Sequence, residues 1–343
     1  MKNLIDKRRV RFLPVVLLLL LIANPLFAQR RITIKLASLV PENTAWGAAI
    51  NRLAAEWNRA TNGEVVVTVY HSGTAGDEPE VLRKLRLNQI QAAVFTSMGM
   101  NAVMPEVMAF SYPFLIRNDA EFAEVMRRLK PDLDTRIQQN GFVTLAWVHA
   151  GWIKLFSRNP VITPADLRRQ KLATGADDQQ MIQAFRIMGY QMVPVELSQL
   201  LILLNNNSLD AVYQSPVYAA ANQVFGICRN MSSVNVAPFM GGILMNNAAW
   251  RSIPDRYKPQ LLDICASIER DIGASIATLE RDAIATMVRY GLQINELTPE
   301  QLEVWYDDTA RFENNLVGTS NAVFNRDYYL RIRNILTEYR RGR

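Results

Sequence analysis

The segment from Pro160 to Pro216 reads PVITPADLRRQKLATGADDQQMIQAFRIMGYQMVPVELSQLLILLNNNSLDAVYQSP. Short apolar runs in and just before it alternate with stretches whose apolar residues recur at helical spacing. The predicted strands lie near 153–157, 170–174, 190–195 and 209–213, and the predicted helices near 178–188 and 197–205. Strands that alternate with helices are typical of an α/β unit whose sheet is covered by helices. The segment therefore predicts one α/β domain.

A second set of alternating elements precedes this segment. ITIKLAS, from Ile32, alternates apolar and polar residues as a strand does, and VVVTVY, from Val65, is a run of β-branched residues. A helix is predicted from about Thr44, another has Pro79 in its first turn, and IQAAVF supplies a third strand. These elements predict a second α/β unit before Ala150.

The rest of the chain indicates that the two units are interleaved. A strand at 241–247 is expected to return to the first unit. Residues 255–290 read as one helix of about 36 residues, which would be about 54 Å long and so would cross two domains. Further helices are predicted near 298–317 and 325–341. We therefore expect a two-domain α/β fold with mixed sheets and a shared long helix. Domain I would comprise 29–150 with about 241–272, and domain II 151–240 with about 273–343.

Residues 1–28 have the pattern of a signal peptide. Five Lys and Arg residues precede an apolar run from Leu13 to Ala23, which is too short to span a bilayer, and cleavage is expected near Ala28. An uncleaved membrane anchor is the alternative. The leader also holds one Asp, so its removal lowers the net charge from +6 to about +2. That balance gives no reason to expect a nucleic-acid partner.

Few residues suit catalysis or metal binding. The chain has two histidines and two cysteines, Cys228 and Cys265, and neither cysteine lies in a nucleophile motif. Buried thiols are expected at these two positions, with a disulfide as the alternative. The sequence has no His, Cys, Asp and Glu residues at the spacing of a metal site, and no nucleotide-binding motif. The protein is therefore not expected to be an enzyme or to need a cofactor.

Motifs along nearly the whole chain resemble one family. The segment from Pro160 follows the pattern P-I-x-T-P-x-D-L-x-G-x-K-I-R through Thr163, Pro164, Asp166 and Lys171. Gly63–Ala93, Val107–Phe114 and the segment NNAAWRSIPDRY also fit, in the expected order. Together they resemble the solute-binding proteins of TRAP transporters, the tripartite ATP-independent periplasmic transporters. This resemblance implies two α/β domains that close on a ligand, and membrane permease subunits as partners.

The chain departs from that pattern where the family holds a carboxylate. Ala173 stands at the arginine of K-I-R, and Ile153 stands at a second arginine near the start of the second domain. A buried carboxylate needs a charged partner, so a simple dicarboxylate is expected to bind poorly. The alternative is an organic acid held by a substitute cation from Lys154, Arg158 or Lys171.

The predicted function is therefore the periplasmic capture of a small, largely apolar or uncharged ligand by domain closure. An alternative is a periplasmic carrier of hydrophobic ligands that works with a soluble TPR-repeat partner. Ligands of such folds bind near strand ends, where apolar, aromatic and a few polar side chains gather. The candidate ligand-binding residues are Trp46, Phe95, Met98, Tyr112, His149, Trp152, Ile153, Ala173, Tyr213, Gln214, Phe239 and Met240.

Overall fold

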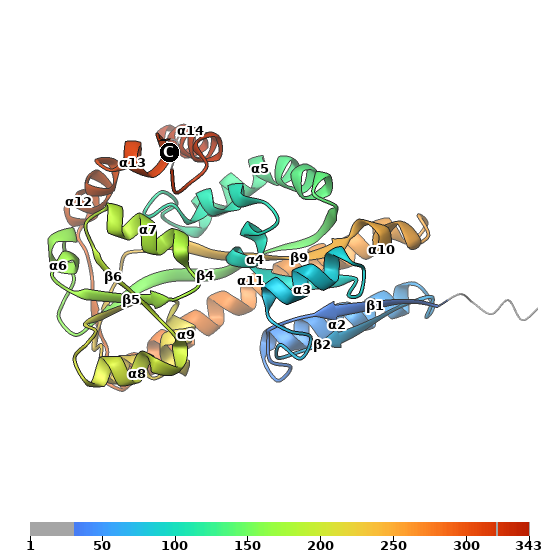
Figure 1. The fold of residues 1–343 in the computed structure, drawn as a ribbon, viewed down its shortest axis with the longest axis horizontal. Helices are drawn as coiled ribbons and strands as arrows, with labels where there is room; N and C mark the ends of the chain where they lie inside the picture. Colours follow the sequence, from blue (N-terminus) through green and yellow to red (C-terminus); the bar gives the residue numbers. More distant parts are fainter. Residues whose placement is uncertain (1–30, 320–321, 343) are drawn as a thin grey trace, which may run out of the picture.

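A computed structural model describes residues 31–319 and 322–342, and of residue 197 only the backbone (Figure 1). The predicted signal peptide and its cleavage near Ala28 lie outside the described residues. Among the helices that the structure describes, none has the length and apolar character needed to cross a membrane.

The strands form one connected, mixed sheet with helices on its faces (Figure 1). Its main path runs β2-β1-β3-β9-β4-β7-β5-β6, while β8 pairs with β4 and with β10. The strands are β1 (Ile32–Ala37), β2 (Val65–Tyr70), β3 (Ala92–Thr96), β4 (Phe142–Ser157), β5 (Lys171–Gly175), β6 (Gln191–Val195), β7 (Ala211–Gln214), β8 (Asn230–Ser232), β9 (Ala237–Asn246) and β10 (Gln293–Asn295).

The first half is built on β1, β2 and β3, which are parallel. The predicted strands and helices of this half are confirmed. Thr44 caps the first helix through its side chain, and Asp77 caps the next, so both helices begin where the polar signals lie. The helices of this half are α2 (Ala45–Ala60), α3 (Glu78–Arg86), α4 (Ser97–Asn101), the 3-10 helix η1 (Pro105–Ser111), α5 (Asp119–Gln139) and α10 (Asn247–Ser252).

The second half is built on β5, with β6 and β7 parallel on either side. The helices α6 (Pro164–Arg168), α7 (Gln179–Ile187), α8 (Leu197–Asn205) and α9 (Pro216–Ala221) follow its strands, and η2 (Val224–Gly226) comes next. The five elements predicted from 170 to 213 are all present within a residue or two. Thr163 and Asp166 form a reciprocal capping box that starts α6.

Two long strands join the halves, and here the predictions were incomplete. The strand predicted at 153–157 is only the end of β4, which begins at Phe142 and pairs with β9 in the first half and with β7 in the second. The prediction stopped short because Gly151, at φ +93°, interrupts the apolar run where the register of β4 shifts against β9. The returning strand predicted at 241–247 is confirmed as β9.

The long helix is α11 (Lys258–Arg289), with 32 residues rather than about 36, because the chain from Asp255 first forms a turn. It packs on α2 in the first half and on α9 in the second, so the expectation that it crosses both is confirmed. The helix predicted at 298–317 is in fact two, α12 (Pro299–Ala310) and α13 (Glu313–Val317).

The last helix, α14 (Arg326–Arg341), lies against α5 and η1 of the first half (Figure 1). Arg340 makes a bidentate ion pair with the buried Glu121 of α5 at 2.7 and 2.8 Å, and Arg331 pairs with Asp132 on the same helix. These contacts hold α14 against the first half. Cys228 and Cys265 are both buried free thiols, as expected.

Candidate ligand-binding cleft

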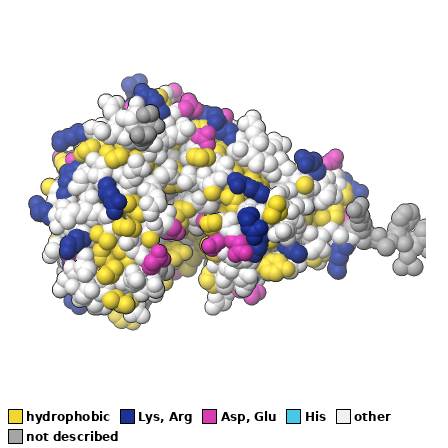
Figure 2. All heavy atoms as spheres, viewed as in Figure 1, with side chains coloured by type: hydrophobic (Ala, Val, Ile, Leu, Met, Phe, Trp, Pro, Cys, Tyr) yellow, Lys and Arg dark blue, Asp and Glu magenta, His cyan; other side chains and the backbone are white. Residues whose placement is uncertain are grey.

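A cleft of about 1080 Å³ lies between the two halves. In the space-filling view of Figure 2 it appears as a hollow, and Asp and Glu side chains lie on both sides of it. The cleft is the place where the two α/β units face each other across β4 and β9.

Strand ends supply most of the lining. The carboxyl ends of parallel strands meet at one edge of a sheet, which is where ligands bind in α/β folds. Thr96 ends β3 and Ser97 follows it on one side, while Thr174 and Gly175 end β5 and Gln214 ends β7 on the other. The cleft is therefore built from loops that the two sheets hold in place.

On the first half, Glu78 joins α3 to the start of α4. Its carboxylate accepts hydrogen bonds from the backbone N–H of Thr96 at 2.5 Å and from the hydroxyl of Thr96 at 2.8 Å. Burial raises the pKa of Glu78, these hydrogen bonds oppose the rise, and the negative charge of Asp177 adds to it. Glu78 and Asp177 therefore repel each other across the cleft.

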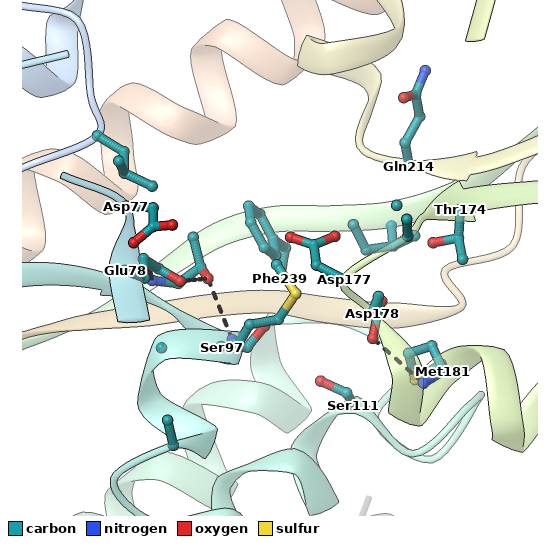
Figure 3. A pocket seen from close by; sticks show the side chains of 18 of the residues that line it. Asp77, Glu78, Ser97, Ser111, Thr174, Asp177, Asp178, Met181, Gln214 and Phe239 are labelled. Atoms are coloured by element: carbon teal, nitrogen blue, oxygen red, sulfur yellow. Dashed lines mark hydrogen bonds between the residues drawn. The ribbon is translucent and has the colours of Figure 1, made fainter. Parts of the chain in front are cut away.

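On the second half, Asp177 and Asp178 form the turn between β5 and α7 (Figure 3). Asp178 caps α7 by accepting from the backbone N–H of Met181 at 3.4 Å. Burial raises the pKa of Asp178 to about 6, and Asp177 contributes to the rise. Asp177 itself is exposed. In Figure 3, Asp77 and Glu78 lie on one side of Phe239, and Asp177 and Asp178 on the other.

Three hydroxyl side chains line the same cleft while being almost completely buried. Ser111, Thr174 and Tyr213 have exposed fractions of 7, 6 and 7 %. None of these hydroxyls forms a hydrogen bond with another residue among those the structure describes. Because no protein group uses these hydroxyls, they are available to a molecule bound in the cleft. The amide nitrogen of Gln214, also on the lining, is buried without a partner in the described part of the chain.

The charges of the lining are mostly negative. Acidic side chains are Asp77, Glu78, Asp177, Asp178 and Glu196, and basic ones are Arg83 and Arg86. Both arginines lie on α3 and are exposed, and Arg86 donates to the carbonyl of Ala102 at 3.2 Å. The basic groups are therefore at the rim, whereas Glu78 and Asp178 are half-buried in the cleft.

Six of the twelve candidate residues line this cleft. Met98 extends from α4, Ile153 from β4, and Phe239 from β9; the remaining three are Ala173, Tyr213 and Gln214. Phe239 lies opposite the irregularity of β4 at Gly151, where the two halves join. The structure thus brings together residues from both units, as a ligand-binding role requires.

Two other candidates are core residues, and a third packs on the core. Phe95 and Met240 are each 1 % exposed. Met240 follows Phe239, and successive side chains of a strand point to opposite faces, so only one of this pair reaches the cleft. Trp46 packs against the cluster beneath β1 and β2, which includes Ile50 and Trp57.

The last three candidates lie near α5 and α14 and do not line the cleft. Tyr112 packs on Tyr329 of α14. His149 stacks on Phe122 of α5, at 4.3 Å between ring centroids, and its Nδ1 lies 3.9 Å from Asp119. Trp152 donates from Nε1 to Asp119 at 2.7 Å. The polar groups of His149 and Trp152 therefore face α5 rather than the cleft.

The two positions that the resemblance assigns to arginine both line the cleft, as Ala173 and Ile153. The three substitute cations do not line it. Lys154 is buried and donates to the carbonyl of Ser233 at 2.9 Å and to Asn235 at 2.8 Å. Arg158 donates to two backbone carbonyls that precede β7, and Lys171 is exposed at the start of β5.

The acidic residues and hydroxyls were not among the candidates. The ligand-binding residues predicted from the sequence included none of Glu78, Ser111, Thr174, Asp177 and Asp178. An acid that opens a helix can serve as a cap, and Asp178 does so. Asp178 also lies shortly after the carboxyl end of β5, and residues at such strand ends face the ligand-binding cleft of an α/β protein. That double signal could have identified Asp178 from the sequence.

A family model described as "Bacterial extracellular solute-binding protein, family 7" matches residues 36–315. The C4-dicarboxylate-binding periplasmic protein DctP of Vibrio cholerae is 20% identical, over 76% of this chain and 79% of its own length. The 2,3-diketo-L-gulonate-binding periplasmic protein YiaO of Escherichia coli is 26% identical over 44% of this chain, which spans 46% of that protein.

Solved structures share the fold. A TRAP periplasmic solute-binding protein from Ochrobactrum anthropi has a TM-score of 0.83, with 17% identity over 92% of this chain and 98% of that one. One from Chromohalobacter salexigens, with bound D-glucuronate, has a TM-score of 0.77, with 16% identity over 88% and 99%. The architecture is that of the two-domain α/β periplasmic binding proteins.

Proposed function

Because this chain belongs to the bacterial extracellular solute-binding proteins of family 7, which bind solutes for transporters and are not enzymes, we propose that it is the periplasmic subunit of a TRAP-type importer. It would capture a small solute by closing its two halves and deliver it to membrane permease subunits. We also propose that the leader is cleaved near Ala28.

The observation that carries this proposal is a cleft lined from both halves, with β4, β9 and α11 running from one half to the other. Crossing segments of this kind let domains move as bodies while a few backbone positions absorb the change. Gly151 in β4, at positive φ beside a register shift, is the proposed hinge position. We propose that the two moving bodies are domain I, residues 29–150 with about 241–272, and domain II, residues 151–240 with about 273–343. The exception is α14, which packs on the first half and would move with domain I.

We further propose that the ligand has a largely apolar body and no carboxylate held by an arginine. Ala173 and Ile153 support this, because neither can pair with an anion at the two positions where the family pattern has arginine. Met98, Met181 and Phe239 supply apolar surface to the cleft. The two relatives named above, from Vibrio cholerae and Escherichia coli, are named for organic acids, and the Chromohalobacter salexigens structure holds D-glucuronate. An organic acid is accordingly the main alternative.

A closure measurement tests the transport role. Protein purified from periplasm would be stripped of bound solute, and extracted small molecules would be identified by mass spectrometry and added back. Small-angle scattering is expected to show a smaller radius of gyration on addition. Phe239→Ala should abolish this change, and Tyr290→Ala, at a 74% exposed aromatic outside the cleft, should not. A protein that binds no solute and never compacts would contradict the proposal.

The carrier alternative, with a soluble TPR-repeat partner, remains a prediction. Isolation of a stable complex with such a protein from periplasm, in cells that lack the permease subunits, would support it over the importer.

A further inference from the structure

The cleft lining is unusual for a site that would hold an acid. Glu78 from the first half and Asp177 and Asp178 from the second contribute carboxylates to one cavity, and Glu78 and Asp177 already interact unfavourably across it. Closure on an empty or anion-filled cleft would bring these like charges closer together and exclude the water that screens them. A ligand that closes this cleft must therefore offset negative charge.

A second, independent observation points to a hydrogen-bonding ligand at the same place. The hydroxyls of Ser111, Thr174 and Tyr213 line the cavity at exposed fractions of 6 to 7 % and have no partner among the described residues. A hydroxyl oxygen accepts hydrogen bonds from N–H groups. These three groups add to the same cavity hydrogen-bond acceptors that the protein itself leaves unused.

We propose that the ligand carries a positively charged nitrogen, an amine or a guanidine, which Asp177 and Asp178 bind from one half and Glu78 from the other. The nitrogen bridges the two halves, replaces their repulsion by attraction, and so drives closure. The hydroxyls of Thr174 and Tyr213 accept its remaining hydrogen bonds. The rings of Phe239 and Tyr213 provide faces on which a cation is favourable. This inference rests on the proposed transport function and names the class of its solute.

An organic cation fits better than a metal ion. Among the described residues, no group of three or more His, Cys, Asp and Glu side chains is arranged to hold a metal. The apolar side chains of Met98, Met181 and Phe239, which line the same cleft, would contact the carbon body of an organic solute. They would contribute nothing to a hydrated divalent ion, whose ligands are oxygens.

The test compares ligands that differ in charge. Stripped wild-type protein is titrated calorimetrically with cations (agmatine, putrescine, pentylamine), with neutral pentanol, with anions (pentanoate, succinate, malate, glucuronate) and with Ca²⁺. Binding is expected from the cations, and it should weaken with rising salt. Tight binding of an anion or of Ca²⁺ in preference to the cations would overturn the inference and leave the transport function standing. If no solute of any class binds or compacts the protein, the transport function itself fails.

A matched pair of variants makes the test specific. Asp177→Asn removes a charge without removing bulk, from an exposed side chain, and should weaken cation binding roughly tenfold to a hundredfold. Asp263→Asn, at an exposed acid on α11 outside the cleft, should change it less than about twofold. If Asp177→Asn leaves cation binding unchanged, or if it strengthens the binding of an anion that wild type already holds tightly, the inference is wrong.

Discussion

Replacement of Asp178 by asparagine should stabilise the protein, and only above mildly acidic pH. Asp178 caps α7 with its side-chain oxygen, and asparagine is an equally good capping residue, so the bond to the N–H of Met181 can be kept. What the substitution removes is a carboxylate that must ionise in a largely buried position beside Asp177.

The magnitude follows from the pKa. Burial raises the pKa of Asp178 from its usual 3.8 to about 6, so the folded protein prefers the protonated form. The cost of ionisation is absent below the unfolded value, grows between the two values, and is complete above the folded one. A rise of about two pH units corresponds to roughly 3 kcal/mol. Stability contributed by this group is therefore lost as the pH rises from about 4 to about 6, which is opposite to the usual behaviour of an ion-paired aspartate.

Urea unfolding of wild type and Asp178→Asn at a series of pH values from about 4 to about 8 measures the effect. The variant should gain about 1 to 3 kcal/mol near pH 8 and almost nothing near pH 4. Asp263→Asn, which removes an exposed acid, should show no such pH-dependent difference. A gain that is the same at every pH, or a loss near pH 8, would refute the account of Asp178.

Three further outcomes are expected. Gly151→Ala should cost about 1 to 3 kcal/mol in urea unfolding, because φ is +93° and the new Cβ would lie 2.8 Å from the carboxylate of Glu280; an unchanged midpoint would show that β4 relaxes there. Trp57→Ala should cost about 3 to 5 kcal/mol, since the fully buried ring also donates to the carbonyl of Leu261 at 3.3 Å, and a loss below about 1 kcal/mol would contradict this. Lys171→Ala should change the solute dissociation constant less than about twofold, because Lys171 is exposed and does not line the cleft. A large loss of affinity would show instead that Lys171 binds the solute.

Much of the fold could be predicted because its signals are local. Runs such as VVVTVY, and the cap Thr44, fix a strand and a helix start within a residue or two. The single turn of α6 after Thr163 was not predicted, because it is too short to show helical periodicity. The helix α5 gave no comparable signal, because charged residues fill much of it and Pro131 lies inside it. The bulge at Gly151 likewise hid the continuity of β4, because an irregular backbone breaks the alternation on which a strand prediction depends.

The residues of the cleft were harder to predict, because whether a residue lines the cleft depends on the face of the sheet or helix to which its side chain points. Phe239 reaches the cleft and Met240 does not, although they are neighbours in one strand. His149 and Trp152 lie in the part of β4 that joins the two halves, but both side chains contact Asp119 of α5 instead of lining the cleft. The acids showed only the pattern of residues that begin helices. Nothing in the sequence indicates that Glu78 and Asp177, which come from different halves, line the same cavity.

A crystal structure of the protein with the solute that it retains from periplasm tests the central claim most directly. A closed cleft is expected, with a nitrogen of the solute about 2.8 Å from a carboxylate oxygen of Asp177 or Asp178. A carboxylate of the solute bound by Arg83 or Arg86, with the acids turned away, would contradict it.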